Sequence, residues 1–187
     1  MNRRQLASFS VAILLDTQVA AQVESTQPRH KVSAARLHQA LEQHFPKRIA
    51  VGGLFDLTLR SPLLHLLPVQ NRLAVELEIN AGGAALRRSY DGSFDIDFSL
   101  RYEASDRTVR AHRLRVRSLR FPGLAPNALQ VLEAYSQRLA DDVLLEVVVH
   151  QLDPRDLALP DAMGLQPGTI TVTAEGLVIG FVPKTAR

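Results

Sequence analysis

The chain has 187 residues, a formal net charge of +3 at pH 7 and hydrophobic residues at 46% of its positions. This length predicts a single domain with a hydrophobic core of its own. The absence of cysteine excludes disulfide bonds, thiolate metal ligands, cysteine nucleophiles and lipid attachment through an amino-terminal cysteine. No stretch reaches the roughly 18 apolar residues of a membrane-spanning helix, so we expect no stable membrane span.

The first 21 residues are typical of a secretory signal peptide. Arg3 and Arg4 give a positive start, residues 6–15 are largely apolar, and residues 19–21 are suited to cleavage before Gln22. An amphipathic first helix of a cytosolic protein is the alternative interpretation. We favour export to the periplasm, by the general secretory or the twin-arginine route, and expect a soluble mature protein.

A polar segment, residues 22–31, follows the leader and is expected to be a disordered lead-in. The domain itself is placed at residues 32–183. Ser33 is a good N-cap, because its hydroxyl can accept a hydrogen bond from a free N–H of the first turn. It predicts a short helix from Ala34 to about His44, which Pro46 prevents from continuing.

Apolar and polar residues alternate with a period of two from residue 48 onward, as in antiparallel strands with one dry face and one solvated face. The alternation is clear at residues 55–60, 73–80 and 94–101, and Gly82-Gly83 and Asp91-Gly92 are turn signals between the last two segments. The next strand, residues 108–121, changes phase, which predicts a β-bulge near His112.

The charges on two of these segments predict how they pair. We expect residues 94–102 to pair antiparallel with residues 110–116, with opposite charges facing one another on the wet face. The expected neighbours are two ion pairs and two apolar pairs: Asp97 with Arg113, Asp95 with Arg115, Ile96 with Leu114, and Phe94 with Val116.

The segment from Pro126 to about Val149 is long, apolar and favourable to helix. Proline suits a first helical position, and Leu132 and Leu139 recur at helical spacing beside a polar stripe. Residues 143–149 are apolar almost all round, which leaves two alternatives: a buried helix, or a helix that passes into a strand. The β-branched residues 147–149 favour the second alternative.

The remaining segments complete the predicted fold. Asp153-Pro154 begins a short helical or irregular piece whose length Pro160 limits, and residues 169–173 and 177–182 predict two closing strands. One long helix must cover the apolar face of several strands, so the sheet has to curl around it or an apolar ligand has to fill the remainder. We therefore predict an α+β fold: a curled antiparallel β-sheet wrapped around one long α-helix, with a short N-terminal helix.

This order of elements resembles the YceB-like family of bacterial envelope lipoproteins, a family of unknown function. The resemblance covers about residues 31–183 and is most specific at residues 149–154 (VHQLDP), with a weaker match at residues 176–178 (GLV). It implies a fold similar to half of a tubular lipid-binding (TULIP-like) domain, with a groove at the mouth of the curl. The family's lipid-accepting cysteine is missing here, and residues 156–165 are shorter than the family's pattern.

No residue pattern indicates an enzyme. The sequence has no phosphate-binding glycine loop, no nucleophile elbow and no serine with an evident base, so we expect no catalytic residues. Asp95 and Asp97 share a strand face, but the alternation of the strand explains them. Six histidines lack the spacing of metal ligands, so we expect no metal site and no cofactor. They are His30, His38, His44, His65, His112 and His150.

Six arginines crowd residues 107–120. They suit an anionic partner such as lipid headgroups, or they pair with Asp95 and Asp97 on the preceding strand. We favour pairing, and we expect no nucleic acid partner because no aromatic residues interleave with the arginines. The candidates for contact with an anionic headgroup are Arg110, Arg113, Arg115 and Arg117.

Two functions fit this sequence. The first is a non-enzymatic cell-envelope protein that holds a lipid-like or other apolar ligand between sheet and helix. Its candidate ligand-binding residues are large apolar side chains of the sheet and the long helix: Phe55, Leu57, Leu77, Ile79, Phe94, Phe98, Leu100, Leu132 and Leu139. The alternative is an envelope protein–protein interaction module with a filled core and no ligand.

Overall fold

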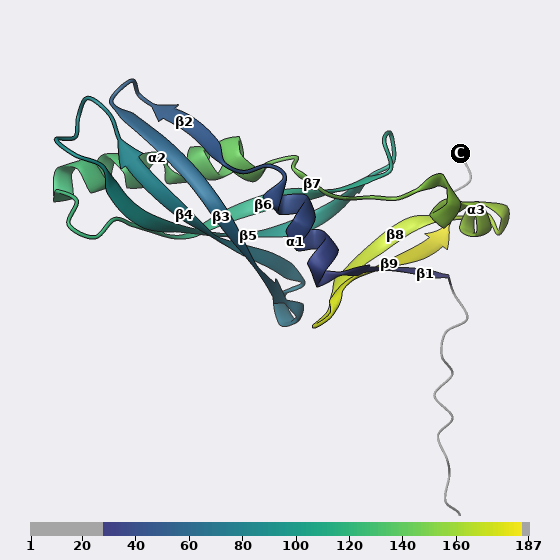
Figure 1. Ribbon diagram of the computed structural model, residues 1–187. Coiled ribbons are helices and arrows are strands. Elements are labelled where there is room, and N and C mark those ends of the chain that lie inside the picture. The colour runs from purple at the N-terminus through teal and green to yellow at the C-terminus, as the bar shows by residue number, and fades with distance from the viewer. Residues whose placement is uncertain (1–27, 185–187) are drawn as a thin grey trace, which may run out of the picture.

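The computed structural model describes residues 28–184. The predicted signal peptide, residues 1–21, and residues 22–27 of the lead-in lie outside the described residues. Two antiparallel sheets and three α-helices make up the described part of the chain, in which no helix is long and apolar enough to cross a membrane. Figure 1 shows an elongated molecule with the larger sheet at one end and the smaller sheet at the other.

Six strands form the larger sheet, and each is antiparallel to its neighbours. They lie side by side in chain order: β2 (Lys47–Val51), β3 (Phe55–Leu67), β4 (Arg72–Gly82), β5 (Tyr90–Glu103), β6 (Thr108–Arg120) and β7 (Val148–Gln151). The strands β3 to β6 contain the segments of alternating hydrophobicity, which confirms the predicted antiparallel sheet.

The long helix α2 (Pro126–Leu144) lies against the apolar face of this sheet (Figure 1). It contacts both β6 and β2, which lie near opposite ends of the strand order. One helix can touch both strands only if the sheet curls around it. The structure is therefore the predicted α+β fold, a curled six-stranded half-barrel packed against one long helix.

The short helix α1 (Ala34–Glu42) lies between the two sheets (Figure 1) and contacts β3 and β7. Its N-cap is Ser33, whose hydroxyl accepts a hydrogen bond from the Arg36 N–H at 3.4 Å, as predicted. The helix α2 ends at Leu144, and the chain turns at Glu146, where φ is 63°, before it continues as β7. This confirms the alternative in which the helix passes into a strand.

The smaller sheet contains three strands in the order β1-β9-β8. These are β1 (Arg29–Ser33), β8 (Leu165–Val172) and β9 (Gly176–Pro183), and α3 (Pro154–Ala162) packs on β8. Residues 29–31 therefore belong to a strand, although we expected them in the disordered lead-in. The reason is that their backbone pairs with β9, about 150 positions later in the chain, and local polarity does not reveal so distant a partner.

The strand β5 pairs with β6 as predicted, but the predicted register is wrong. Asp97 lies opposite Arg115, Ile96 lies opposite Val116, and Phe94 lies opposite Leu119. Beside the turn the pairing is already one residue away from the prediction, since Tyr102 lies opposite Val109, and two register shifts then insert one extra residue each on β6. One lies between His112 and Arg115, which confirms the predicted bulge, and the other lies at Arg117.

Candidate functional site

The side chains predicted to bind a ligand form the packed core between the larger sheet and α2. Eight of the nine are at most 3% exposed, and Leu100 is partly buried against them. They are Phe55, Leu57, Leu77, Ile79, Phe94, Phe98, Leu132 and Leu139. Leu139 also lines a surface hollow of about 350 Å³ together with Tyr135 and Asp142. The structure thus brings these residues together, and it packs them against one another; their role in ligand binding stays a prediction.

An open groove of about 680 Å³ lies beside this core, between α1 and the second half of β3. Its lining is mainly apolar and comes from α1, from the end of β3 and from the turn between β8 and β9. The lining residues are Ala34, Ala35, His38, Leu63, Leu64, His65, Leu66, Pro68 and Ala174. We call this feature the α1–β3 groove.

A bulge in β3 creates the apolar wall of the α1–β3 groove. The register with β4 shifts between Arg60 and Leu63, where Ser61 has a φ of 52° and is followed by Pro62. Beyond the bulge, the even-numbered residues face the core side of the sheet, so Leu64 lies opposite Val75. Leu64 and Leu66 pack against the core but remain partly exposed.

The sequence held a signal for this wall. In residues 61–67 the apolar residues do not alternate, since leucine pairs flank His65, and Pro62 lies inside the strand. A proline within a strand indicates a bulge or an edge strand. Apolar residues at both odd and even positions indicate that neither face of the strand is simply solvated. The predicted alternation ended at residue 60, so this segment was not predicted.

Polar groups lie along the border of the α1–β3 groove. The imidazole Nε2 of His38 is 3.1 Å from Glu42 on the same helix, and the Nε2 of His65 is 4.0 Å from Glu76 on β4. Both histidines are substantially exposed. The groove therefore combines an apolar floor with titratable donors and acceptors at its edge, which is an arrangement suited to an amphipathic molecule.

The tip of the β3–β4 hairpin is tied to the smaller sheet next to this groove. The side-chain amide of Asn71 donates to the carbonyl of Ile170 at 2.9 Å, and its Oδ1 accepts from the N–H of Val172 at 2.7 Å. These two bonds pair with the edge of β8 as a neighbouring strand would. They hold β8, and with it Ala174, against the wall formed by β3.

The arginines of β6 are mainly engaged in ion pairs, which was the interpretation we favoured. Arg117 lies 3.2 Å from Asp97, and Arg120 lies 3.2 Å from Asp95. Of the headgroup candidates, Arg110 and Arg117 are thus paired, and Arg113 and Arg115 are exposed. No ion pair of the described residues includes Arg115.

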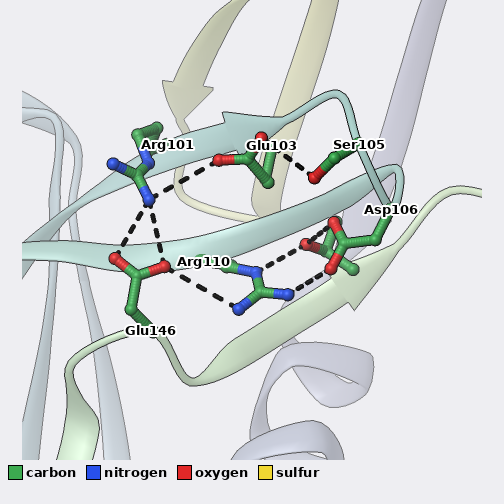
Figure 2. Close-up of polar contacts among 7 residues, drawn as sticks. Arg101, Glu103, Ser105, Asp106, Arg110 and Glu146 are labelled. Carbon is green, nitrogen blue, oxygen red and sulfur yellow. Dashed lines mark hydrogen bonds and ion pairs between the residues drawn. The ribbon is translucent and has the colours of Figure 1, made fainter.

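Arg110 belongs to a network that joins the end of the larger sheet to the link after α2. Figure 2 shows Glu146 between Arg101 of β5 and Arg110 of β6, with the Glu146 carboxylate 3.0 Å from the Arg101 guanidinium. Arg110 also donates to Asp106. The Thr108 hydroxyl and then the Arg110 guanidinium hold the pKa of Asp106 below its ordinary value of 3.8. The guanidinium of Arg110 is thus engaged with Thr108, Asp106 and Glu146, and its role at an anionic headgroup stays a prediction.

Comparison with known proteins adds a distant likeness. No family model matches the chain, and no curated protein sequence matches it. Among solved structures, the chain is similar to one described as the crystal structure of lipopolysaccharide binding protein, with 15% sequence identity and a TM-score of 0.28. The match covers 79% of this chain and 45% of that protein, so the chain spans less than half of its length.

Proposed function

We propose that the protein is a non-enzymatic binding protein of the bacterial envelope, which holds a lipid-like or other apolar ligand in the α1–β3 groove. The observation that carries this proposal is the groove itself. Its volume of about 680 Å³ falls within the roughly 300–1,000 Å³ that is usual for small-molecule sites. Export and membership of the YceB-like family are part of the proposal and are supported by the leader pattern and by residues 149–154.

The proposed binding site is not the space beside the long helix α2. In this proposal the ligand still lies between the sheet and a helix, but the helix is α1 instead of α2, because buried side chains already fill the space beside α2. Leu63, Leu64 and Leu66 give the groove its exposed apolar surface. An acyl chain that covers this surface would gain about 25 cal/mol for each Å² of apolar area removed from water.

The polar end of the ligand belongs at the border of the groove. His38 and His65 lie there, each beside a carboxylate. A hydroxyl or carboxyl head could hydrogen-bond to either imidazole while the chain lies on the leucines. The class of ligand is therefore an amphipathic molecule with one chain, such as a fatty acid or a lysolipid.

The test is displacement of a fluorescent fatty acid from purified protein. We expect uptake by the natural sequence and a large loss of affinity in Leu63→Asp, because the charge would lie in the apolar groove. Leu54→Asp is the matched control, since Leu54 is 52% exposed and Leu63 is 51% exposed, and Leu54 does not line the groove. A second variant, Ala35→Trp, fills the groove from α1. Equal affinity in Leu63→Asp and Leu54→Asp would overturn this location.

The filled core favours a second candidate function, the envelope protein–protein interaction module. Phe94 and Phe98 are fully buried in the core, so the space around them is already filled by protein. Under this second hypothesis, the α1–β3 groove binds an apolar side chain of a partner protein. Absence of fatty-acid uptake by the natural sequence would favour this candidate, whereas uptake that is sensitive to Phe98→Ala or Leu77→Ala would return the ligand to the space beside α2.

A further inference from the structure

Two histidines from distant parts of the chain meet where the two sheets join. His30 in β1 and His150 in β7 place their Nε2 atoms 3.1 Å apart, with ring centroids 5.2 Å apart. The strand β1 belongs to the smaller sheet, and β7 is the last strand of the larger one. The two partly buried imidazoles therefore form a direct polar link between the sheets, which we call the histidine pair.

Charged groups approach the histidine pair from both neighbouring helices. The Oδ1 of Asp156 on α3 is 3.5 Å from the Nδ1 of His30, and Arg36 on α1 places its positive charge near His150. The paired strands present apolar residues, since Ile179 of β9 lies opposite His30 and Val109 of β6 lies opposite His150.

The position of Asp156 is fixed by the start of α3. Its carboxylate accepts a hydrogen bond from the Asp153 N–H at 2.9 Å, within a capping box in which Asp153 accepts from the Arg155 N–H at 3.0 Å. This carboxylate can accept a hydrogen bond from the Nδ1–H of His30. It therefore favours the form of His30 whose Nε2 lone pair is turned to the Nε2–H of His150.

The contact between the two Nε2 atoms depends on protonation. One Nε2–H can donate to the lone pair of the other ring as long as at least one ring is neutral. When both rings are protonated, two N–H donors and two positive charges face one another at this distance, and the contact becomes repulsive. Asp156 can compensate one of the charges, and Arg36 adds to the repulsion.

A metal ion is the other common reason for two histidines to approach so closely. Among residues 28–184, no group of three or more His, Cys, Asp and Glu side chains is arranged to hold a metal. The distance of 3.1 Å is also that of an ordinary hydrogen bond. The contact between the two histidines is therefore a hydrogen bond.

We propose that the histidine pair is an acid-sensitive latch, which holds the two sheets together near neutral pH and releases them when both rings are protonated. Burial first, and then the charge of His30, lower the pKa of His150 below its ordinary value of 6.5, so the second proton enters only below that pH. The closed pair is thus complete at pH 6.5 and above, and it is lost as the pH falls through the lowered pKa of His150.

Opening of the latch would alter the α1–β3 groove, because β1 leads directly into α1. Ser33 is both the last residue of β1 and the N-cap of α1, and Ala34 and Ala35 directly after it line the groove. Release of β1 from β7 therefore loosens one wall of the groove. The consequence, release of an apolar ligand in acid, rests on the proposed function, whereas the opening of the latch does not.

The experiment measures the distance between the two sheets without any ligand. Because the natural chain has no cysteine, Ala50→Cys in β2 and Ala162→Cys in α3 can carry a pair of spin labels on two exposed positions on either side of the junction. We expect the pulsed-resonance distance distribution to shift or broaden between about pH 7.5 and about pH 5. His150→Gln and His30→Gln should each remove this change, since one remaining histidine cannot form the doubly charged pair.

The matched controls are His38→Gln and His65→Gln, which alter the histidines of the groove and should keep the acid response. A thermal melt near neutral pH confirms that each variant is folded. An unchanged distribution in the natural sequence, or an acid response that persists in both His150→Gln and His30→Gln, overturns the latch. If the latch responds but no fluorescent fatty acid binds at either pH, the proposed function fails and the latch stands.

Discussion

Arg72 of β4 donates a hydrogen bond to the backbone carbonyl of Arg113 on β6, at 2.7 Å and across the whole width of β5. The same guanidinium donates to the carboxylate and, at 3.1 Å, to the carbonyl of Asp97, the residue between them. Arg72 and Asp97 are 8% and 5% exposed although they lie on the outer face of the curled sheet. Arg113 has a φ of 50° in the β6 bulge, so Arg72 satisfies a carbonyl that the irregular strand would otherwise leave without a partner.

Replacement of Arg72 by methionine should therefore destabilise the protein strongly. The substitution leaves Asp97 charged and largely buried, with Arg117 as its remaining ion-pair partner, and it removes the donor to the bulge carbonyl. Breaking one side of a buried ion pair costs about 3–5 kcal/mol. Urea unfolding at neutral pH measures the loss.

The controls for this prediction use the same face of the sheet. Arg115→Met changes an exposed arginine of β6 and should alter the free energy of unfolding by about 0.5 kcal/mol or less. The double variant Arg72→Met/Asp97→Leu should recover much of the loss, because no buried charge remains. A small effect of Arg72→Met would mean that water replaces the guanidinium.

Asn71 should contribute to stability through its side chain and through its backbone conformation. Its φ of 51° is left-handed, which glycine adopts without strain. Asn71→Gly keeps that conformation and removes the two hydrogen bonds to β8, so we expect a loss of about 1–3 kcal/mol in urea unfolding. Gln70→Gly, one residue earlier and exposed, is the control for added chain flexibility. Equal losses in the two variants would mean that the contact with β8 contributes nothing.

The core position of α2 makes Leu132 and Leu139 sensitive to truncation. They are 1% and 2% exposed, so Leu→Ala at either should lower the free energy of unfolding by about 2–5 kcal/mol. Val131→Ala, on the same helix at 39% exposure, is the control and should cost much less. A loss of similar size at Val131 would place that face of α2 against a partner.

The elements that the sequence predicted correctly are those whose signal is local. The alternation of β3 to β6, the Ser33 cap and the apolar spacing of α2 each depend on residues close together in the chain, and each is present in the structure. The strand β1 was missed because its partner, β9, lies at the other end of the described chain. The register of β5 with β6 was wrong because the pairing beside the turn is one residue away from the expected one and each bulge adds another residue. The second bulge, at Arg117, moves the apolar positions from Leu114 and Val116 to Leu119 and Phe121, a change of phase that the prediction did not include.

The α1–β3 groove lay beyond sequence reasoning for a similar reason. Its walls come from three separate segments, and the one that carries Ala174 is held in place by Asn71, more than 100 positions earlier. The apolar residues that the alternation did identify are buried by α2 instead. Hydrophobic patterning predicts which side chains avoid water, but it does not predict whether protein or ligand covers them.

Export remains a prediction that is independent of the fold. The leader pattern predicts a mature chain that begins at or near Gln22. Amino-terminal sequencing of material from the native host checks it, and a variant with Arg3 and Arg4 replaced by lysine separates the twin-arginine route from the general secretory route. An intact Met1 in the cytoplasmic fraction would contradict export.

Stability should fall on mild acidification because of His150. Burial lowers the pKa of this imidazole below 6.5, so the unfolded chain, in which the pKa is ordinary, binds the proton more readily than the folded protein. The contribution to stability is therefore complete above pH 6.5 and is lost as the pH falls from there toward the lowered pKa. We expect the free energy of unfolding of the natural sequence to decrease between about pH 7.5 and about pH 5 by more than that of His150→Gln.

The comparison of the two pH profiles isolates this effect from the other titrating groups. His150→Gln keeps a side chain that can hydrogen-bond to His30 but does not titrate, and every carboxylate is the same in both proteins. His44→Gln is the matched control, because the Nδ1 of His44 lies 2.9 Å from the carbonyl of Ala40 on the exposed end of α1, away from the histidine pair. The profile of His44→Gln should follow the natural sequence. Parallel profiles for the natural sequence and His150→Gln would show that His150 takes up its proton equally well in the folded and the unfolded chain.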